Sequence, residues 1–285
     1  MHYEGMIFRP PSESDSLLVQ VTIGCSWNQC TFCDMYTEKK FRIRSMDEIK
    51  ADLIEGSRWR DRIRRIFLCD GDSLVLKTPM LLEILETIRD LYPDLEAVRM
   101  YATAKDILRK SHEELCQLQQ AGLEMVYIGL ESGSDKVLTE VRKGITKAEM
   151  IEAGHAVTRA GIRQSISIIS GLGGQELSEE HILETADALN QMQPDYVGML
   201  VLHAGNDTHM YQKIAEGTFR LPSAQQVLSE MKLLLEHLEL KHCYFTSAHA
   251  SNYIDVRGRL PQDKEDMLNT IHRLTELVNK REGNR

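Results

Sequence analysis

Short apolar runs alternate with amphipathic segments along most of the chain. The runs read "LLVQVTI", "RIFLC", "AVRMYATA", "MVYIGL", "SISIIS", "YVGMLVL" and, more weakly, "CYFTSA". Apolar runs of this length are typical of strands buried on both faces, as in a parallel sheet covered by helices. The pattern therefore predicts repeated strand–helix units and an α/β fold.

Helix starts are marked by capping boxes, in which Ser or Thr precedes Glu or Gln by three residues. The boxes are Ser45 with Glu48, Ser111 with Glu114, Thr146 with Glu149, and Ser223 with Gln226. Further helices are predicted after Thr78 with Pro79, from Ser178 in "SEEHILETADAL", and from Pro261 in "PQDKEDMLNTIHRL".

Six clear strand–helix units and a weaker seventh favour an incomplete barrel, because a complete eightfold barrel takes about 250 residues. We therefore expect a partial (β/α)6 TIM-like barrel in a single domain with a short C-terminal extension. The expected boundaries are an N-terminal segment at 1–15, a core domain at 16–260 and a C-terminal helix at 261–285.

Composition narrows the partners and the location. The 34 basic and 43 acidic residues give a net charge of −9, and the basic segment "EKKFRIR" is short. This balance argues against broad nucleic-acid binding. No stretch approaches the roughly 20 apolar residues of a membrane helix, and the first residues lack the apolar core of a signal peptide. We expect a cytoplasmic protein with no membrane partner.

Three of the six cysteines are crowded into "GCSWNQCTFC", residues 24–33. Cys25, Cys30 and Cys33 follow the first predicted strand, at the end where parallel sheets and barrels place active sites. Three thiolates can hold a four-iron cluster and leave one iron without a protein ligand. A structural zinc site would require a fourth Cys or His, and the next His is His112. Zinc and an unrelated group of core cysteines remain the alternatives.

The cysteine loop resembles that of the radical S-adenosylmethionine (radical SAM) enzymes. Their usual loop is CxxxCxxC with an aromatic residue before the last cysteine, and Phe32 occupies that place here. This chain has one extra residue, CxxxxCxxC. The resemblance covers roughly residues 16–260. It implies that Cys25, Cys30 and Cys33 bind a [4Fe–4S] cluster and that its open iron binds S-adenosylmethionine.

Other stretches extend the resemblance in chain order. "CDGDS" partly matches the turn that receives the methionyl amino group, which implies cofactor contacts at Asp70, Gly71 and Asp72. An ordinary turn after a strand, with glycine supplying a positive φ, explains this segment equally well.

"YIGLESGSDKVLTEVRKGITKAEM" resembles the branch that includes anaerobic porphyrin oxidases and tRNA thiomethylases. It implies that Glu131 faces the ribose or amino-acid part of the cofactor and that Lys143 meets its carboxylate. A solvated helix entrance is the alternative for Lys143. "RQSISIISGLGGQELSEEH" resembles the strand and loop that bind adenine and ribose, which implies roles for Ser167 and Gly171.

The resemblance implies an enzyme that cleaves S-adenosylmethionine reductively to a 5′-deoxyadenosyl radical, which then abstracts a substrate hydrogen. It also implies an external one-electron donor such as flavodoxin or ferredoxin. Two other classes stay open, a non-catalytic iron–sulfur electron carrier and a zinc-stabilised binding protein.

Polar residues gather at predicted strand ends in the last third of the chain, where we expect a small-molecule or peptide substrate. His203, His249 and Asn252 are the candidate catalytic residues, and the histidines could donate protons or hold substrate carboxylates. Structural histidines are the alternative. The segments "LHAGNDTHMY" and "TSAHASNYIDVRGRLP" also contribute Asn206, Asp207, His209 and Tyr253.

Overall fold

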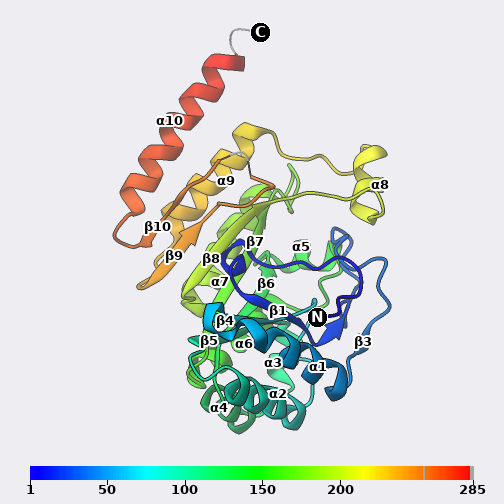
Figure 1. The fold of residues 1–285 in the computed structure, drawn as a ribbon. Helices are drawn as coiled ribbons and strands as arrows, with labels where there is room; N and C mark the ends of the chain where they lie inside the picture. Colours follow the sequence, from blue (N-terminus) through cyan, green and yellow to red (C-terminus); the bar gives the residue numbers. More distant parts are fainter. Residues whose placement is uncertain (253, 283–285) are drawn as a thin grey trace. The chain divides into compact units, whose positions relative to one another are not determined.

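The computed structural model describes residues 1–252 and 254–282 and has an α/β architecture (Figure 1). Its contacts divide the chain into two compact units. The first comprises residues 1–28, 35–128 and 155–164, and the second comprises residues 29–34, 129–154 and 165 onward. The cysteine loop is thus shared, with Cys25 in the first unit and Cys30 and Cys33 in the second.

The first unit is built on parallel strands in the order β1-β4-β5-β6. Helices α1, α2 and α4 pack side by side, α2 touching both of the others. A short antiparallel pair, β2 with β3, flanks the cysteine loop in sequence. The strands are β1 Leu17–Gln20, β2 Thr22–Ile23, β3 Arg42–Ile43, β4 Arg65–Cys69, β5 Ala97–Ala102 and β6 Leu123–Glu131. The helices are η1 Pro11–Glu13, α1 Met46–Gly56, η2 Ser57–Arg62, α2 Thr78–Leu91, α3 Ala104–Leu108 and α4 His112–Gln120.

The second unit continues with β7, β8 and β9 in parallel and β10 antiparallel to β9. Helix α9 packs against both α7 and α10. Strands β6 and β7 and helix α6 each contribute residues to both units. The strands are β7 Arg163–Ser170, β8 Tyr196–Val201, β9 Cys243–Thr246 and β10 Arg257–Leu260. The helices are α5 Asp135–Glu140, α6 Lys147–Arg159, α7 Ser178–Met192, α8 His209–Ala215, α9 Ala224–His237 and α10 Lys264–Glu282.

The predicted parallel strands are confirmed, including the weak run "CYFTSA", which forms β9. The run "LLVQVTI" is divided between β1 and β2. Strand β10 was not predicted, because its residues "RGRL" alternate exposed arginines with buried positions and lack a continuous apolar run. Among the described residues, no helix is long and apolar enough to cross a membrane.

The four predicted capping boxes are confirmed. Helix α7 begins at Ser178, as predicted. Two other helix starts need correction. Thr78 is the first residue of α2 rather than its cap, since Lys77 holds the cap position. Helix α10 begins at Lys264, three residues after Pro261.

The predicted segment boundaries at residues 15 and 260 stay predictions. Residues 283–285 of the predicted C-terminal helix lie outside the described residues.

Candidate functional site

In the first unit, the turn after β4 packs directly on the first cysteine of the loop. A Cβ atom at Gly71 would lie 2.9 Å from the Cβ of Cys25 and 2.6 Å from the Tyr36 ring. Since real Cβ atoms do not approach this closely, only glycine fits at this position. The "CDGDS" turn and Cys25 are therefore in direct contact, and the predicted cofactor contacts of Asp70, Gly71 and Asp72 stay a prediction.

Asp70 ties that turn to the start of the cysteine loop. Its fully buried carboxylate accepts hydrogen bonds through Oδ2 from the Gly24 backbone N–H at 2.9 Å and the Gln20 side chain at 3.0 Å. The Lys39 ammonium lies 2.7 Å from the same oxygen and also donates to the Met6 carbonyl. Oδ2 of Asp70 therefore fixes the backbone at Gly24, which leads into Cys25.

Asp72 holds the next residues of the loop, because the Ser26 hydroxyl donates to its carboxylate. Burial, and after it the neighbouring Asp106 carboxyl, raise the pKa of Asp72 to about 8, while the Ser26 hydroxyl opposes the shift. Asp106 belongs to helix α3, and Lys105 of the same helix places its ammonium 3.2 Å from the centre of the Trp27 ring. Helix α3 thus supports residues 26 and 27 of the cysteine loop.

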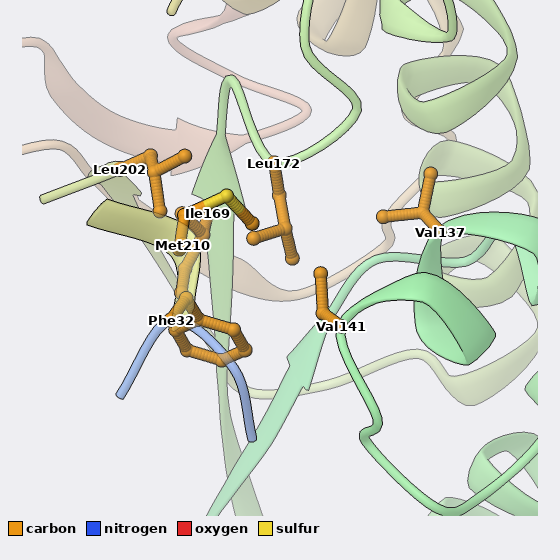
Figure 2. Close-up of a cluster of buried hydrophobic side chains, with 7 residues drawn as sticks. All are labelled: Phe32, Val137, Val141, Ile169, Leu172, Leu202 and Met210. Atoms are coloured by element: carbon orange, nitrogen blue, oxygen red, sulfur yellow. The ribbon is translucent and has the colours of Figure 1, made fainter. Parts of the chain in front are cut away.

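In the second unit, residues 29–34 are held by backbone hydrogen bonds on both sides. The Thr31 N–H donates to the Val141 carbonyl, and the Thr31 carbonyl accepts from the Met210 N–H, each at 2.9 Å. Phe32 is buried in a hydrophobic cluster whose side chains turn toward one another in Figure 2. The other members of the cluster are Val137, Val141, Ile169, Leu172, Leu202 and Met210.

Cys30 and Cys33 are partly buried and pack against this cluster. An apolar wall excludes water and strengthens electrostatic interactions beside the two thiols. Phe32 thus contributes to that wall, and its predicted contact with a cofactor stays a prediction.

The second unit also brings together Glu131, Lys143 and Ser167. The Lys143 ammonium lies 3.0 Å from Oε1 of Glu131, and the Ser167 hydroxyl donates to Oε2 at 3.4 Å. Burial alone would lower the pKa of Lys143, but Glu131 and then the Cys30 and Cys33 thiols raise it above its usual value. Lys143 is therefore a largely buried residue that pairs with Glu131 and interacts electrostatically with both cysteines, rather than a solvated residue at a helix entrance.

Gly171 begins the loop after β7 with φ +82°, and a Cβ there would lie 2.5 Å from Pro222. Its N–H donates to the buried carboxylate of Glu230 at 2.7 Å. The hydroxyls of Ser170 and Ser178 donate to the same carboxylate at 2.6 and 2.5 Å. Sequence reasoning missed Glu230, although a carboxylate between Val227 and Met231 on the apolar face of α9 was a detectable signal.

The candidate catalytic residues occupy different environments. His203 is exposed just after β8, as are Asn206, Asp207 and His209. His249 is half-buried, which lowers its pKa, and its Nδ1 lies 2.8 Å from the Ser251 hydroxyl. The Asn252 amide donates to the carbonyls of Met199 and Ser247, so it ties the loop after β9 to β8. Tyr253 lies outside the described residues.

The donor chemistry of the loop suits an iron–sulfur cluster, because thiolates are the ligands that such clusters take. Within residues 1–252 and 254–280, no group of three His, Cys, Asp or Glu side chains is already arranged around a metal position. Cys69 and Cys243 lie buried on β4 and β9, and burial raises the pKa of both thiols, that of Cys243 to about 12. Cys116 is only partly buried and lies beside His112.

Sequence comparison gives a family match and a distant relative. The family model of the radical SAM superfamily matches residues 19–189 of this chain. An uncharacterized methyltransferase of Pyrococcus horikoshii is 23% identical over 198 residues, which cover 68% of this chain and 41% of that protein. The chain therefore spans less than half the length of this curated relative.

Solved structures are similar over most of the chain. The radical SAM methyltransferase TsrM from Kitasatospora setae, with tryptophan and a SAM analogue bound, has a TM-score of 0.58 at 19% identity, covering 72% of this chain and 39% of TsrM. Methylornithine synthase PylB has a TM-score of 0.56 at 15% identity, and the match covers 93% of this chain and 81% of PylB. Coproporphyrinogen III oxidase HemN from Escherichia coli has a TM-score of 0.55 at 15% identity, and the match covers 78% of this chain and 51% of HemN. These similarities confirm the predicted partial-barrel fold.

Proposed function

Because this chain belongs to the radical SAM superfamily, we propose that Cys25, Cys30 and Cys33 hold its [4Fe–4S] cluster and that Glu131, Lys143 and Ser167 bind S-adenosylmethionine. The protein is an enzyme, and its cofactors are the cluster and S-adenosylmethionine. When bound and supplied with one electron by an external donor, they would provide the radical chemistry that removes a hydrogen atom from a substrate.

The observation that supports the assignment best is the pairing of Lys143 with Glu131 within electrostatic reach of Cys30 and Cys33. A cation beside an acidic residue and a hydroxyl can bind both the carboxylate of an amino acid and the hydroxyls of a ribose. The apolar cluster around Phe32 excludes water on the side of the two cysteines.

In the first unit, Asp70, Asp72 and Gly71 contact the start of the cysteine loop, and their contact with S-adenosylmethionine remains part of the proposal. Asp70 and Asp72 hold Gly24 and Ser26 on either side of Cys25, and Gly71 packs against Cys25 itself. Their role in the proposal is to fix the path of the longer CxxxxCxxC loop.

The substrate and the reductant complete the proposal. A small molecule or peptide is the substrate class, His203 and His249 are the candidate proton donors, and flavodoxin or ferredoxin is the candidate electron donor. A cytoplasmic location, where thiols stay reduced, accords with six free cysteines.

The test is production of 5′-deoxyadenosine by anaerobically reconstituted protein with dithionite. Lys143→Met should retain iron but lose affinity for S-adenosylmethionine. Lys136→Met is the matched control, since Lys136 is exposed and pairs with Glu180 on the surface. A wild-type protein that holds iron yet neither binds nor cleaves S-adenosylmethionine would instead indicate an electron carrier, and a zinc protein would hold no iron.

A further inference from the structure

Glu131 has a backbone conformation that side chains other than glycine rarely adopt. Its φ is +61°, and the next N–H, that of Ser132, donates to the Leu130 carbonyl at 2.8 Å. A left-handed residue of this kind costs about 1–3 kcal/mol and persists only where its surroundings impose it. Something in the second unit must therefore hold the chain at Glu131.

Helix α7 supplies that hold immediately after Glu131. Nδ1 of His181 lies 2.8 Å from the Ser132 hydroxyl, and the Thr185 hydroxyl accepts from the Gly133 N–H at 2.8 Å. A Cβ at Gly133 would lie 2.1 Å from the Glu184 carbonyl oxygen, so the helix backbone approaches the segment as closely as glycine permits.

The partners of His181 define which nitrogen carries its proton. Nε2 lies 3.0 Å from the Ile169 carbonyl, which can only accept, so Nε2 donates there. In the neutral ring Nδ1 then accepts from the Ser132 hydroxyl. The ring is buried at 1% exposure, and burial lowers its pKa, which favours this neutral form. The Ser132 hydroxyl oxygen in turn accepts from the Ser134 N–H at 3.0 Å.

We propose that His181 is a positioning residue, which holds Ser132 so that the strained Glu131 keeps its carboxylate aligned with Lys143 and Ser167. His181 acts through Ser132 alone in this role, and its bond to Ile169 anchors the ring on β7. The inference rests on the proposed function for what Glu131 and Lys143 bind.

Two conservative variants separate the two bonds of His181. In His181→Asn, the shorter amide places a polar atom near the position of Nδ1 and keeps the contact with Ser132. In His181→Gln, the longer amide reaches the position of Nε2 and keeps the contact with Ile169. Each variant loses one buried hydrogen bond, so similar unfolding midpoints are expected.

The readouts are the dissociation constant for S-adenosylmethionine, the iron content and the thermal midpoint of anaerobic reconstituted protein. His181→Gln should bind about tenfold more weakly, the equivalent of one hydrogen bond, and His181→Asn no more than about threefold more weakly. Ser132→Ala, a small change that should fold even where the histidine variants do not, should weaken binding as His181→Gln does.

Equal affinities for the two histidine variants, weaker binding by His181→Asn, or wild-type affinity in Ser132→Ala would overturn the positioning role. In those cases the wild type still binds S-adenosylmethionine, and the proposed function stands. A wild-type protein that holds iron and does not bind S-adenosylmethionine would overturn both the positioning role and the proposed function.

Discussion

Replacing Lys39 with methionine should destabilise the first unit substantially, because Asp70 would keep a buried charge without its counterion. Oδ2 of Asp70 and Nζ of Lys39 are 2.7 Å apart, and the two side chains are 0% and 8% exposed. Removing one partner of a buried ion pair costs about 3–5 kcal/mol. Gln20 and the Gly24 N–H still donate to Asp70, so we expect about 3 kcal/mol.

A double-mutant cycle isolates the pair. Lys39→Met with Asp70→Asn removes both charges, and the neutral amide carries a far smaller desolvation cost, so the double variant should be more stable than Lys39→Met alone. Unfolding in urea, followed by circular dichroism, gives the free energy of unfolding for the wild type, Lys39→Met, Asp70→Asn and the double variant.

We expect a coupling energy above about 1.5 kcal/mol. A Lys39→Met protein within about 0.5 kcal/mol of wild type, the usual range for surface substitutions, would refute the reasoning. It would show that Asp70 does not depend on Lys39 for its charge.

Other predictions concern the residues that support the loops. Because burial raises the pKa of Asp72 to about 8, the native state binds a proton that the unfolded chain has lost, so this residue's contribution to stability falls as pH rises from about 4 to 8. Urea unfolding at several pH values should show a weaker fall for Asp72→Asn, and an unchanged pH profile would contradict this. Glu230→Ala leaves buried donors without an acceptor and should lower the free energy of unfolding by about 3 kcal/mol or more, with Glu230→Gln intermediate; equal losses for the two variants would contradict the role of both carboxylate oxygens as acceptors. Lys105→Met should cost about 0.5–2 kcal/mol and alter Trp27 fluorescence, whereas an unaltered spectrum would rule out their contact.

The secondary structure was largely predictable where local interactions decide it. The capping boxes at Ser45, Ser111 and Ser223 need only residues three apart, and each forms as expected. Thr78 was misassigned as a cap because a distant carboxylate competes for its hydroxyl, which donates to Glu114. Tertiary acceptors of this kind leave no trace in the local sequence.

The site was predictable only in part. Cys25, Cys30 and Cys33 are recognisable from spacing, and the resemblance to a family also pointed to Glu131 and Lys143, which the structure pairs. Their assignment as ligands and binding residues stays a prediction.

Single buried polar residues, such as Lys39 and His181, were not found. Their partners lie 31 and 49 positions away, and one lysine or histidine in a helix or loop gives no pattern. Asn252 shows the converse, since a polar residue at a predicted strand end uses its amide to fix a loop.

The central claim is that the three clustered cysteines hold a [4Fe–4S] cluster. The most direct measurement is the iron content of anaerobically reconstituted wild-type, Cys30→Ala and Cys116→Ala proteins, with Cys116→Ala as the matched control for loss of one thiol. The account predicts about four iron atoms per chain in the wild type and in Cys116→Ala, and a marked loss in Cys30→Ala. A wild-type protein without iron, or a Cys30→Ala protein with wild-type iron content and an unchanged visible spectrum, would contradict it.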